Sequence, residues 1–270
     1  MFTTPPVVKN ILIINVLMFF ATMSFKSIGI DLDEYLALYY WGSPKFMPHQ
    51  LITHAFMHAN FAHIFFNMFA VWMFGRNLEL FWGPKRFLTY YVLVAIGAGV
   101  IYELYLTYDF SVMNALLTEL QNHPSPVIFS QFVKRYIPVG MDPNLTFQLQ
   151  HVITEWSRDP NNPMYLESVK PLINDYVNFK LNIPTVGASG AVYGVLLAFG
   201  MTFPNTMIML LFPPIPIKAK YFVLIFGLIE LFSGMEHNPT DNVAHFAHLG
   251  GMIFGYILLR YWRNKDIESY

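Results

Sequence analysis

Ser189 lies in the stretch GASGAVYG, residues 187–194, between small residues at the start of an apolar run. A serine hydroxyl is a weak nucleophile until a neighbouring base takes its proton, and imidazole is the side chain best suited to do so near neutral pH. His248, at the start of another apolar run, is the candidate base. The chain has no cysteine, which excludes thiol catalysis, thiolate metal sites and disulfides. These residue types indicate nucleophilic catalysis by serine.

A third apolar run also begins with polar side chains. Asn60 is a candidate helix N-cap, and His63 and Asn67 follow it four residues apart, on one face of the predicted helix. A tetrahedral intermediate needs hydrogen-bond donors aimed at its developing negative charge. The Asn67 amide, the His63 ring and the Ser189 backbone N–H, near the positive ends of their helices, are the candidate donors.

No acid is in an evident position to complete a triad. His245 and His248 lie one turn apart after Thr240 and Asp241, which we expect to cap their helix. Asp241 is seven residues before His248, so we predict a Ser–His dyad. The carboxylates near predicted helix ends are expected to tether loops; they are Glu79, Glu103 and Glu230.

The remaining histidines form no recognised metal motif. The run HAFMH, residues 54–58, lacks the Glu of a zinc-binding HExxH motif, so no metal is predicted. His54 and His58 belong to a proline-containing aromatic segment, typical of a loop at the membrane interface. For His245, a hydrogen-bonded packing role and a tuning of His248 both remain open.

The composition is that of a membrane protein, with 55% hydrophobic and 12% charged residues and a mean hydropathy of +0.41. The net charge of -1 gives no reason to expect a nucleic-acid partner. No small-residue cleavage site follows the first apolar segment, so we interpret it as a span. Six segments approach the roughly 20 residues that a helix needs to cross a bilayer; they are 8–25, 61–80, 87–106, 186–203, 221–232 and 243–262.

The distribution of Lys and Arg predicts the orientation of these spans. Nine of them flank one set of span ends: Lys9, Arg76, Lys85, Arg86, Lys218, Lys220, Arg260, Arg263 and Lys265. The other short loops contain only Lys26 and Lys45, which puts both termini in the cytoplasm. The second, fourth and sixth spans then run inward, with their polar first turns at similar depth.

Small residues indicate how these spans meet. Gly190 and Gly194 form a GxxxG step, Gly251 and Gly255 form another, and Gly187 precedes the serine. Such steps allow the backbones of two helices to approach closely. They are common in membrane helices, so the serine motif alone is equally compatible with a packing role.

In order along the chain, the motifs resemble those of the rhomboid intramembrane serine proteases, in their six-span bacterial form. The matching runs are HAFMHANFAHIFFNM, GRNLELFWG with Glu79 and Gly83, GASGAVYG and AHLGGMIFG. The resemblance implies that Ser189 is the nucleophile, His248 the base, and His63 and Asn67 oxyanion donors, and that Tyr193 packs on the base imidazole.

The resemblance further implies an all-α, six-helix membrane bundle as one domain, residues 1–270, in a bacterial cytoplasmic membrane. It implies no cofactor and no metal, and as partners the bilayer and membrane-protein substrates, of the single-span kind. The extracytoplasmic segment 107–183 is an insertion with three expected amphipathic helices, either a tolerated insertion or a substrate-docking element. The alternative function is a rhomboid-fold pseudoprotease that binds membrane clients; a transporter is disfavoured, because no inverted repeats are evident.

Overall fold

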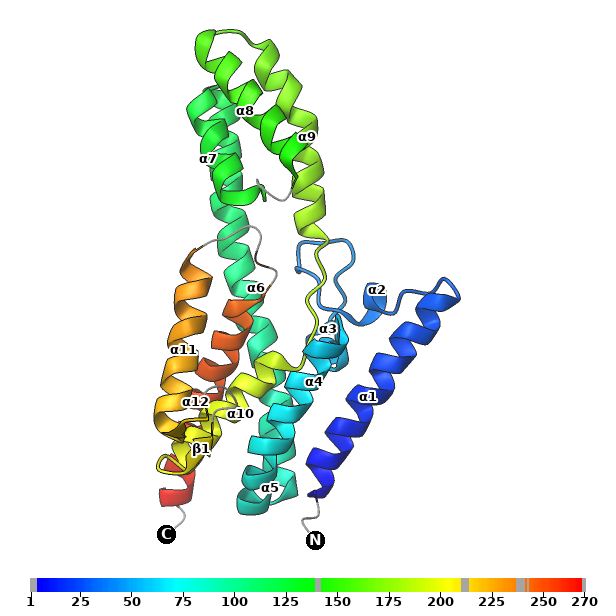
Figure 1. The fold of residues 1–270 in the computed structure, drawn as a ribbon, viewed down its shortest axis with the longest axis vertical. Coiled ribbons are helices and arrows are strands. Elements are labelled where there is room, and N and C mark those ends of the chain that lie inside the picture. Colours follow the sequence, from blue (N-terminus) through cyan, green and yellow to red (C-terminus); the bar gives the residue numbers. More distant parts are fainter. Residues whose placement is uncertain (1–3, 139–141, 210–213, 237–240, 242, 269–270) are drawn as a thin grey trace. The chain divides into compact units, whose positions relative to one another are not determined.

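The computed structural model describes residues 4–138, 142–209, 214–236, 241 and 243–268. The chain is mostly helical and forms two compact units (Figure 1). The first unit comprises Met1–Glu103, Pro184–Gly234 and Ala244–Tyr270, and the second comprises Leu104–Ile183 and Met235–Val243.

Every apolar segment predicted to span the membrane is helical in the structure. In chain order, the helices that include residues of the first unit are α1 (Pro6–Ser27), α2 (Asp33–Leu36), α3 (Gln50–Thr53), the 3-10 helix η1 (His54–Phe56), α4 (Phe61–Ala70), the π-helix η2 (Val71–Gly75), α5 (Arg76–Trp82), α6 (Pro84–Asn122), α10 (Ser189–Thr202), α11 (Ala219–Glu236) and α12 (His245–Glu268).

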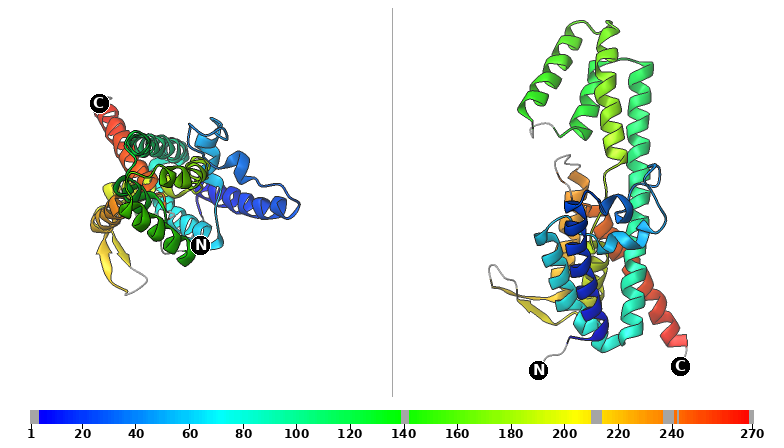
Figure 2. Two further views of the ribbon diagram at one scale, coloured as in Figure 1. Left: turned by 90° about the horizontal axis from the view of Figure 1, so that it is seen from above. Right: turned by 90° about the vertical axis from the view of Figure 1, so that its right-hand side faces the viewer.

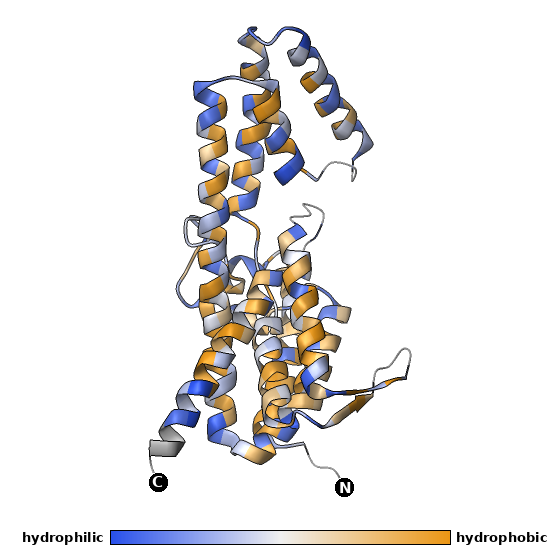
Figure 3. Cartoon of the chain, turned by 90° about the vertical axis from the view of Figure 1, so that its left-hand side faces the viewer, coloured by the Kyte–Doolittle hydropathy of each residue, from blue (hydrophilic) through white to orange (hydrophobic). Residues whose placement is uncertain are grey.

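Two of the described helices are long and apolar enough to cross a membrane, Pro6–Ser27 and Pro84–Asn122, and Ser189–Thr202 is a shorter apolar helix. Apolar residues predominate along the first unit's helices (Figure 3), and many of the large ones are exposed. The crossing of a bilayer by all six segments remains a prediction.

The first unit also contains a short hairpin that the all-helical prediction lacked. Strands β1 (Met207–Met209) and β2 (Pro216–Lys218) pair antiparallel, with Ile208 opposite Ile217. The hairpin projects from the helices of this unit (Figure 2).

Helix α10 packs tightly against α6 and α12 through the predicted glycines. A Cβ added at Gly190 would lie 2.6 Å from Ala98 Cβ, and one added at Gly194 would lie 2.9 Å from the Gly251 carbonyl oxygen. A Cβ at Gly251 would overlap the Gly190 carbonyl oxygen, and one at Gly255 would meet the Tyr90 hydroxyl. The two GxxxG steps therefore set the separation of the helices that carry Ser189 and His248.

Two of the three carboxylates expected to tether chain segments do so. Glu79 is buried, and its two carboxylate oxygens accept the backbone N–H groups of Val7 and Val8 at 2.9 and 2.8 Å. These N–H groups belong to the first turn of α1 and have no partner within the helix. Glu103 accepts the backbone N–H of Trp41 at 2.8 Å.

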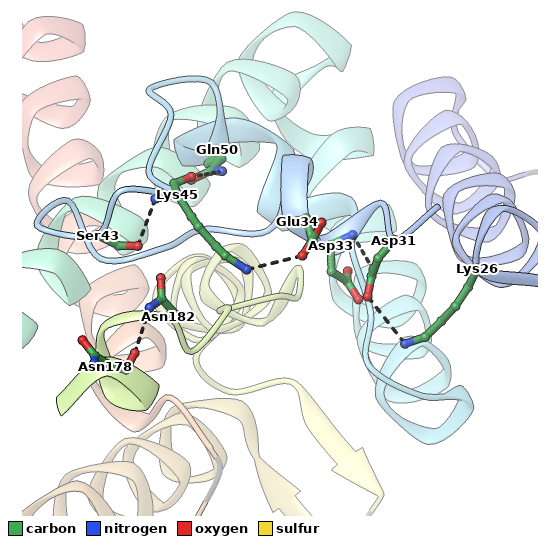
Figure 4. Close-up of polar contacts among 9 residues, drawn as sticks. All are labelled: Lys26, Asp31, Asp33, Glu34, Ser43, Lys45, Gln50, Asn178 and Asn182. Atoms are coloured by element: carbon green, nitrogen blue, oxygen red, sulfur yellow. Dashed lines mark hydrogen bonds and ion pairs between the residues drawn. The ribbon is translucent and has the colours of Figure 1, made fainter. Parts of the chain in front are cut away.

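The loop between α1 and α4 is organised around the fully buried side chain of Gln50. Its Oε1 accepts the Met47 N–H at 3.0 Å. Its Nε2 donates to the Lys45 carbonyl, also at 3.0 Å (Figure 4). An exposed ion pair between Lys45 and Glu34 at 3.3 Å lies on the same loop. Because the amide satisfies backbone groups that burial removes from water, it holds the irregular stretch before α3 in one conformation.

This loop also fixes the segment that leads into α10. Leu38 and Thr185 exchange backbone hydrogen bonds of 2.9 and 2.8 Å, and Gly187 donates its N–H to the His54 carbonyl at 2.9 Å. The backbone just before Ser189 is therefore held at two points, Thr185 and Gly187.

The second unit contains more helix than the sequence predicts. Helix α6 continues without a break to Asn122, although its span was predicted to end at residue 106, and α7 (Pro126–Tyr136), α8 (Pro143–Arg158) and α9 (Met164–Leu181) follow. Helix α7 is additional to the three helices predicted in this segment. Ser125 caps it by accepting the Val127 N–H at 3.2 Å, and Pro126 is its first residue.

A buried carboxylate joins three helices of this unit. Asp109 on α6 forms ion pairs with Lys180 on α9 and, at 3.5 Å, with Arg135 on α7. The four helices alternate between polar and apolar residues (Figure 3), as expected for amphipathic helices. The three stretches that the sequence predicts to be helical lie in α6, α8 and α9. The status of 107–183 as an extracytoplasmic insertion remains a prediction.

Candidate active site

Ser189 is the first residue of α10, so its backbone N–H is one of the groups that the helix leaves without an internal partner. Gly187, two residues earlier, has φ +127°, which side-chain-bearing residues rarely adopt. A Cβ there would also lie 2.6 Å from His63 Nε2 and 3.5 Å from Ser189 Oγ. The glycine is thus required by both conformation and space, and the His63 ring lies beside the serine.

The structure brings the predicted nucleophile and base together. Ser189 Oγ lies 2.8 Å from His248 Nε2, a hydrogen bond between α10 and α12. The Tyr193 ring stacks on the His248 ring, with centroids 4.4 Å apart and planes 10° from parallel. Because Ser189 and Tyr193 are one turn apart on α10, one helix face supplies both contacts to the imidazole.

Glu230 on α11 contacts the other side of the base, and its predicted loop-tethering role is wrong. Its Oε2 lies 2.9 Å from His248 Nδ1 and 2.6 Å from His245 Nδ1, and its Oε1 accepts the Tyr193 hydroxyl. The carboxylate is 5% exposed. The expectation that no acid contacts the base is corrected by this geometry.

The sequence did contain a signal for Glu230. It lies within the apolar run VLIFGLIELF, where a carboxylate is costly and is therefore a functional candidate by default. Because Glu230 lies near the end of the predicted span, a loop-tethering role was predicted for it. Asp241, the acid weighed instead, accepts the Val243 N–H at 2.9 Å and does not cap α12, which begins at His245; Thr240 lies outside the described residues.

Among the described residues, Glu230, His245 and His248 form a group that could hold a metal ion. The Glu230 carboxylate and one nitrogen each of His245 and His248 lie within 4.8 Å of one another. Two imidazoles and a carboxylate are ligands that zinc accepts. In this structure these atoms are engaged in hydrogen bonds with one another.

The two side chains among the three candidate oxyanion donors, His63 and Asn67, lie on α4, and both contact His58. Asn60 caps the helix as predicted, by accepting the His63 N–H at 2.9 Å. The Asn67 Nδ2 donates to His58 Nε2 at 3.1 Å, and the His58 and His63 rings meet edge to face at 5.0 Å. Burial lowers the pKa of His58 to about 4, so that its ring stays neutral and can accept from Asn67.

Comparison with known proteins assigns the chain to one family. The rhomboid-domain model matches residues 45–115 and 166–265, which include every member of the site. The chain belongs to the rhomboid family. Rhomboid membership makes it a membrane protein and supports an intramembrane protease or rhomboid-like function. Residues 116–165, within the second unit, lie outside the rhomboid match.

Curated relatives bear the same family name. An uncharacterized mitochondrial rhomboid protein of Schizosaccharomyces pombe is 25% identical over 229 residues, covering 80% of this chain and 52% of the relative. Mitochondrial rhomboid protein 1 of Saccharomyces cerevisiae is 24% identical over 219 residues, covering 81% and 43%. Mitochondrial RHOMBOID-like protein 12 of Arabidopsis thaliana is 37% identical over 60 residues, covering 22% and 18%.

The chain spans about half the length of the first two curated relatives that it matches. All three relatives are mitochondrial by name, so the predicted bacterial cytoplasmic membrane gains no support from them.

Proposed function

We propose that this rhomboid is an intramembrane serine endopeptidase that cleaves membrane-protein substrates, of the single-span kind, in or near their transmembrane segments. The observation that carries the proposal is the 2.8 Å hydrogen bond between Ser189 Oγ and His248 Nε2. A nucleophile and a base within hydrogen-bond reach are what acyl transfer requires.

In the proposed reaction, Ser189 Oγ forms a bond to the scissile carbonyl carbon while its proton passes to His248 Nε2. The oxyanion of the tetrahedral intermediate accepts hydrogen bonds from the Ser189 backbone N–H, the His63 ring and the second N–H of the Asn67 amide. Collapse breaks the C–N bond, and the proton passes from His248 to the leaving amine. Water then attacks the acyl-enzyme carbonyl while His248 takes its proton; collapse breaks the bond from the acyl carbon to Ser189 Oγ, and His248 returns the proton to that oxygen.

The surroundings of the site favour a substrate within the membrane. The helices that carry Ser189, Glu230 and His248 are three of the predicted spans, and a six-span topology with cytoplasmic termini brings their polar ends to similar depth. The proposed reaction uses no cofactor and no metal. A rhomboid-fold pseudoprotease is the second candidate, and it has no need of a nucleophile hydrogen-bonded to a base.

Cleavage of a single-span reporter by the purified protein tests the proposal. Ser189→Ala and His248→Ala should each lower turnover on the order of 10⁶-fold, because nucleophile and base act as one unit. The matched control is Ser27→Ala, which removes an exposed hydroxyl at the end of α1. Equal cleavage by Ser189→Ala would contradict the proposal, and binding of the reporter without cleavage by the wild type would favour the pseudoprotease.

A further inference from the structure

We infer that Glu230 is a positioning residue for the base, so that the site operates as a Ser189–His248–Glu230 triad; the inference rests on the proposed function. The three side chains form a continuous series of hydrogen bonds. Ser189 Oγ lies 2.8 Å from His248 Nε2, and His248 Nδ1 lies 2.9 Å from Glu230 Oε2. The series connects α10, α12 and α11 in that order.

The carboxylate selects the tautomer that catalysis needs. An ionised carboxylate has no hydrogen to donate and can only accept, so the hydrogen of neutral His248 resides on Nδ1. The lone pair of Nε2 is then directed at the Ser189 hydroxyl, which is the arrangement of a general base. With the hydrogen on Nε2 instead, the imidazole could not take the proton of the serine.

Glu230 also faces the positive charge that forms on the base. When Nε2 takes the serine proton, His248 becomes an imidazolium whose Nδ1–H remains hydrogen-bonded to the carboxylate. The carboxylate stays ionised throughout, and the charge pair lasts until the proton passes to the leaving amine. Coulomb attraction at this distance is strong in a site shielded from water, so the carboxylate lowers the energy of the charged intermediate.

The carboxylate is itself fixed by the other contacts of the cluster. The Tyr193 hydroxyl donates to Oε1, and His245 Nδ1 lies 2.6 Å from Oε2. These hydrogen bonds offset the cost of burying an ionised group. Tyr193 therefore restrains both the imidazole, by stacking, and the carboxylate, by hydrogen bonding.

The rival role for Glu230 is that of a clamp between α11 and α12, and the pH dependence of turnover separates the two. The titratable groups that face His248 in the described residues are Glu230 from α11, Tyr193 from α10, His63 from α4 and His245 on α12 itself. Of these, Glu230 is the group that places a negative charge beside the imidazole. If Glu230 positions the base, removing this charge moves the acid limb of the kcat/KM profile against pH. If Glu230 is only a clamp, its removal lowers stability and leaves the limb in place.

The test compares Glu230→Gln with Glu103→Gln in steady-state cleavage of a reporter across pH. Glu103 is a fully buried carboxylate of the same unit that tethers a backbone N–H away from the base. Glu230→Gln should lower kcat by about 10²- to 10⁴-fold with KM little changed, and should move the acid limb of kcat/KM to lower pH. Glu103→Gln should leave the limb where it is.

Should Glu230→Gln fail to fold, Glu230→Asp provides the readout. This variant keeps the charge but shortens the side chain by one methylene. We therefore expect kcat to fall, and the acid limb to move less than expected for Glu230→Gln, which removes the charge. An unmoved acid limb in Glu230→Gln, or wild-type kcat in Glu230→Asp, would overturn the inference.

Two alternatives to the triad, a metal site at Glu230 and a protein without protease activity, give distinct experimental results. Loss of wild-type cleavage in EDTA that Zn²⁺ restores would assign Glu230 to a metal site and overturn the inference. A wild-type protein with no Ser189-dependent cleavage would refute the proposed function itself, and that result is distinct from normal cleavage in Glu230→Gln.

Discussion

Gly251→Ala should disable the site by moving α12 away from α10. Gly251 lies three residues after His248, and Gly190 follows Ser189 directly. The added Cβ would overlap the Gly190 carbonyl oxygen, which belongs to the backbone and cannot rotate away. The contact lies one turn from the 2.8 Å hydrogen bond between the serine and the base. A displacement there is therefore transmitted to the reacting groups.

The size of the effect follows from ordinary contact distances. A methyl carbon and a carbonyl oxygen need more than 3 Å, so the helices must separate on the order of 1 Å. Overpacking of this kind costs about 1–3 kcal/mol of stability, offset in part by the gain of about 1 kcal/mol in helix propensity from Gly to Ala. A 1 Å misplacement of reacting groups costs about 10²-fold in rate, so activity should suffer more than stability.

The assay measures the rate of labelling by a fluorophosphonate probe together with the thermal melt. Gly227→Ala is the matched control, because its Cβ would meet the flexible end of one side chain, with Met252 Cε at 3.1 Å and Sδ at 3.6 Å. The control should label at the wild-type rate. Gly251→Ala should label about 10²-fold more slowly while still melting cooperatively. Wild-type labelling by Gly251→Ala would refute the claim that this glycine contact sets the separation of nucleophile and base.

Three other predictions concern the donors, the loop and the insertion. Asn67→Ala should lower kcat by about 10²- to 10³-fold in steady-state cleavage, because one oxyanion donor is lost; an unchanged kcat would remove Asn67 from the mechanism. Burial lowers the pKa of His54 to about 4, below the 6.5 of the exposed ring, so the unfolded state binds more protons between these values. The His54 contribution to stability is complete above pH 6.5 and falls by up to about 3 kcal/mol as pH drops to 4; melts of His54→Gln should lack this slope, and an equal slope would contradict the assignment. Replacing 116–165, which lie outside the rhomboid match, by a short linker should preserve labelling of Ser189, and loss of labelling in a folded protein would show that the insertion supports the site.

Local spacing explains why much of the site could be predicted. Residues four apart on one helix face the same way, so the pairing of His63 with Asn67 and of Ser189 with Tyr193 follows from the sequence alone. Stacking of Tyr193 on the base, implied by the family resemblance, is present at 4.4 Å. The Asn60 cap is equally local, since an N-cap and the N–H group that it accepts lie within one turn.

Glu230 could not be placed in the same way, because its partner His248 lies 18 residues further on another helix. Helix α11 is apolar on nearly all sides, so no polar face indicates which side turns toward the bundle. Its rotation is set by contacts between helices, such as Gly200 against Val223, which no local pattern encodes. Helix α7 was missed for another reason: α6 ends at Asn122, but proline can begin a helix as readily as follow one, and Pro126 is the first residue of α7.

Mass-spectrometric mapping of the fluorophosphonate adduct tests the central claim most directly. Wild-type protein in a folded preparation should carry one adduct, on Ser189, because only the serine hydrogen-bonded to His248 is activated. The adduct should be absent from His248→Ala that melts like the wild type. An adduct on a different serine, or equal labelling of Ser189 in His248→Ala, would contradict the account.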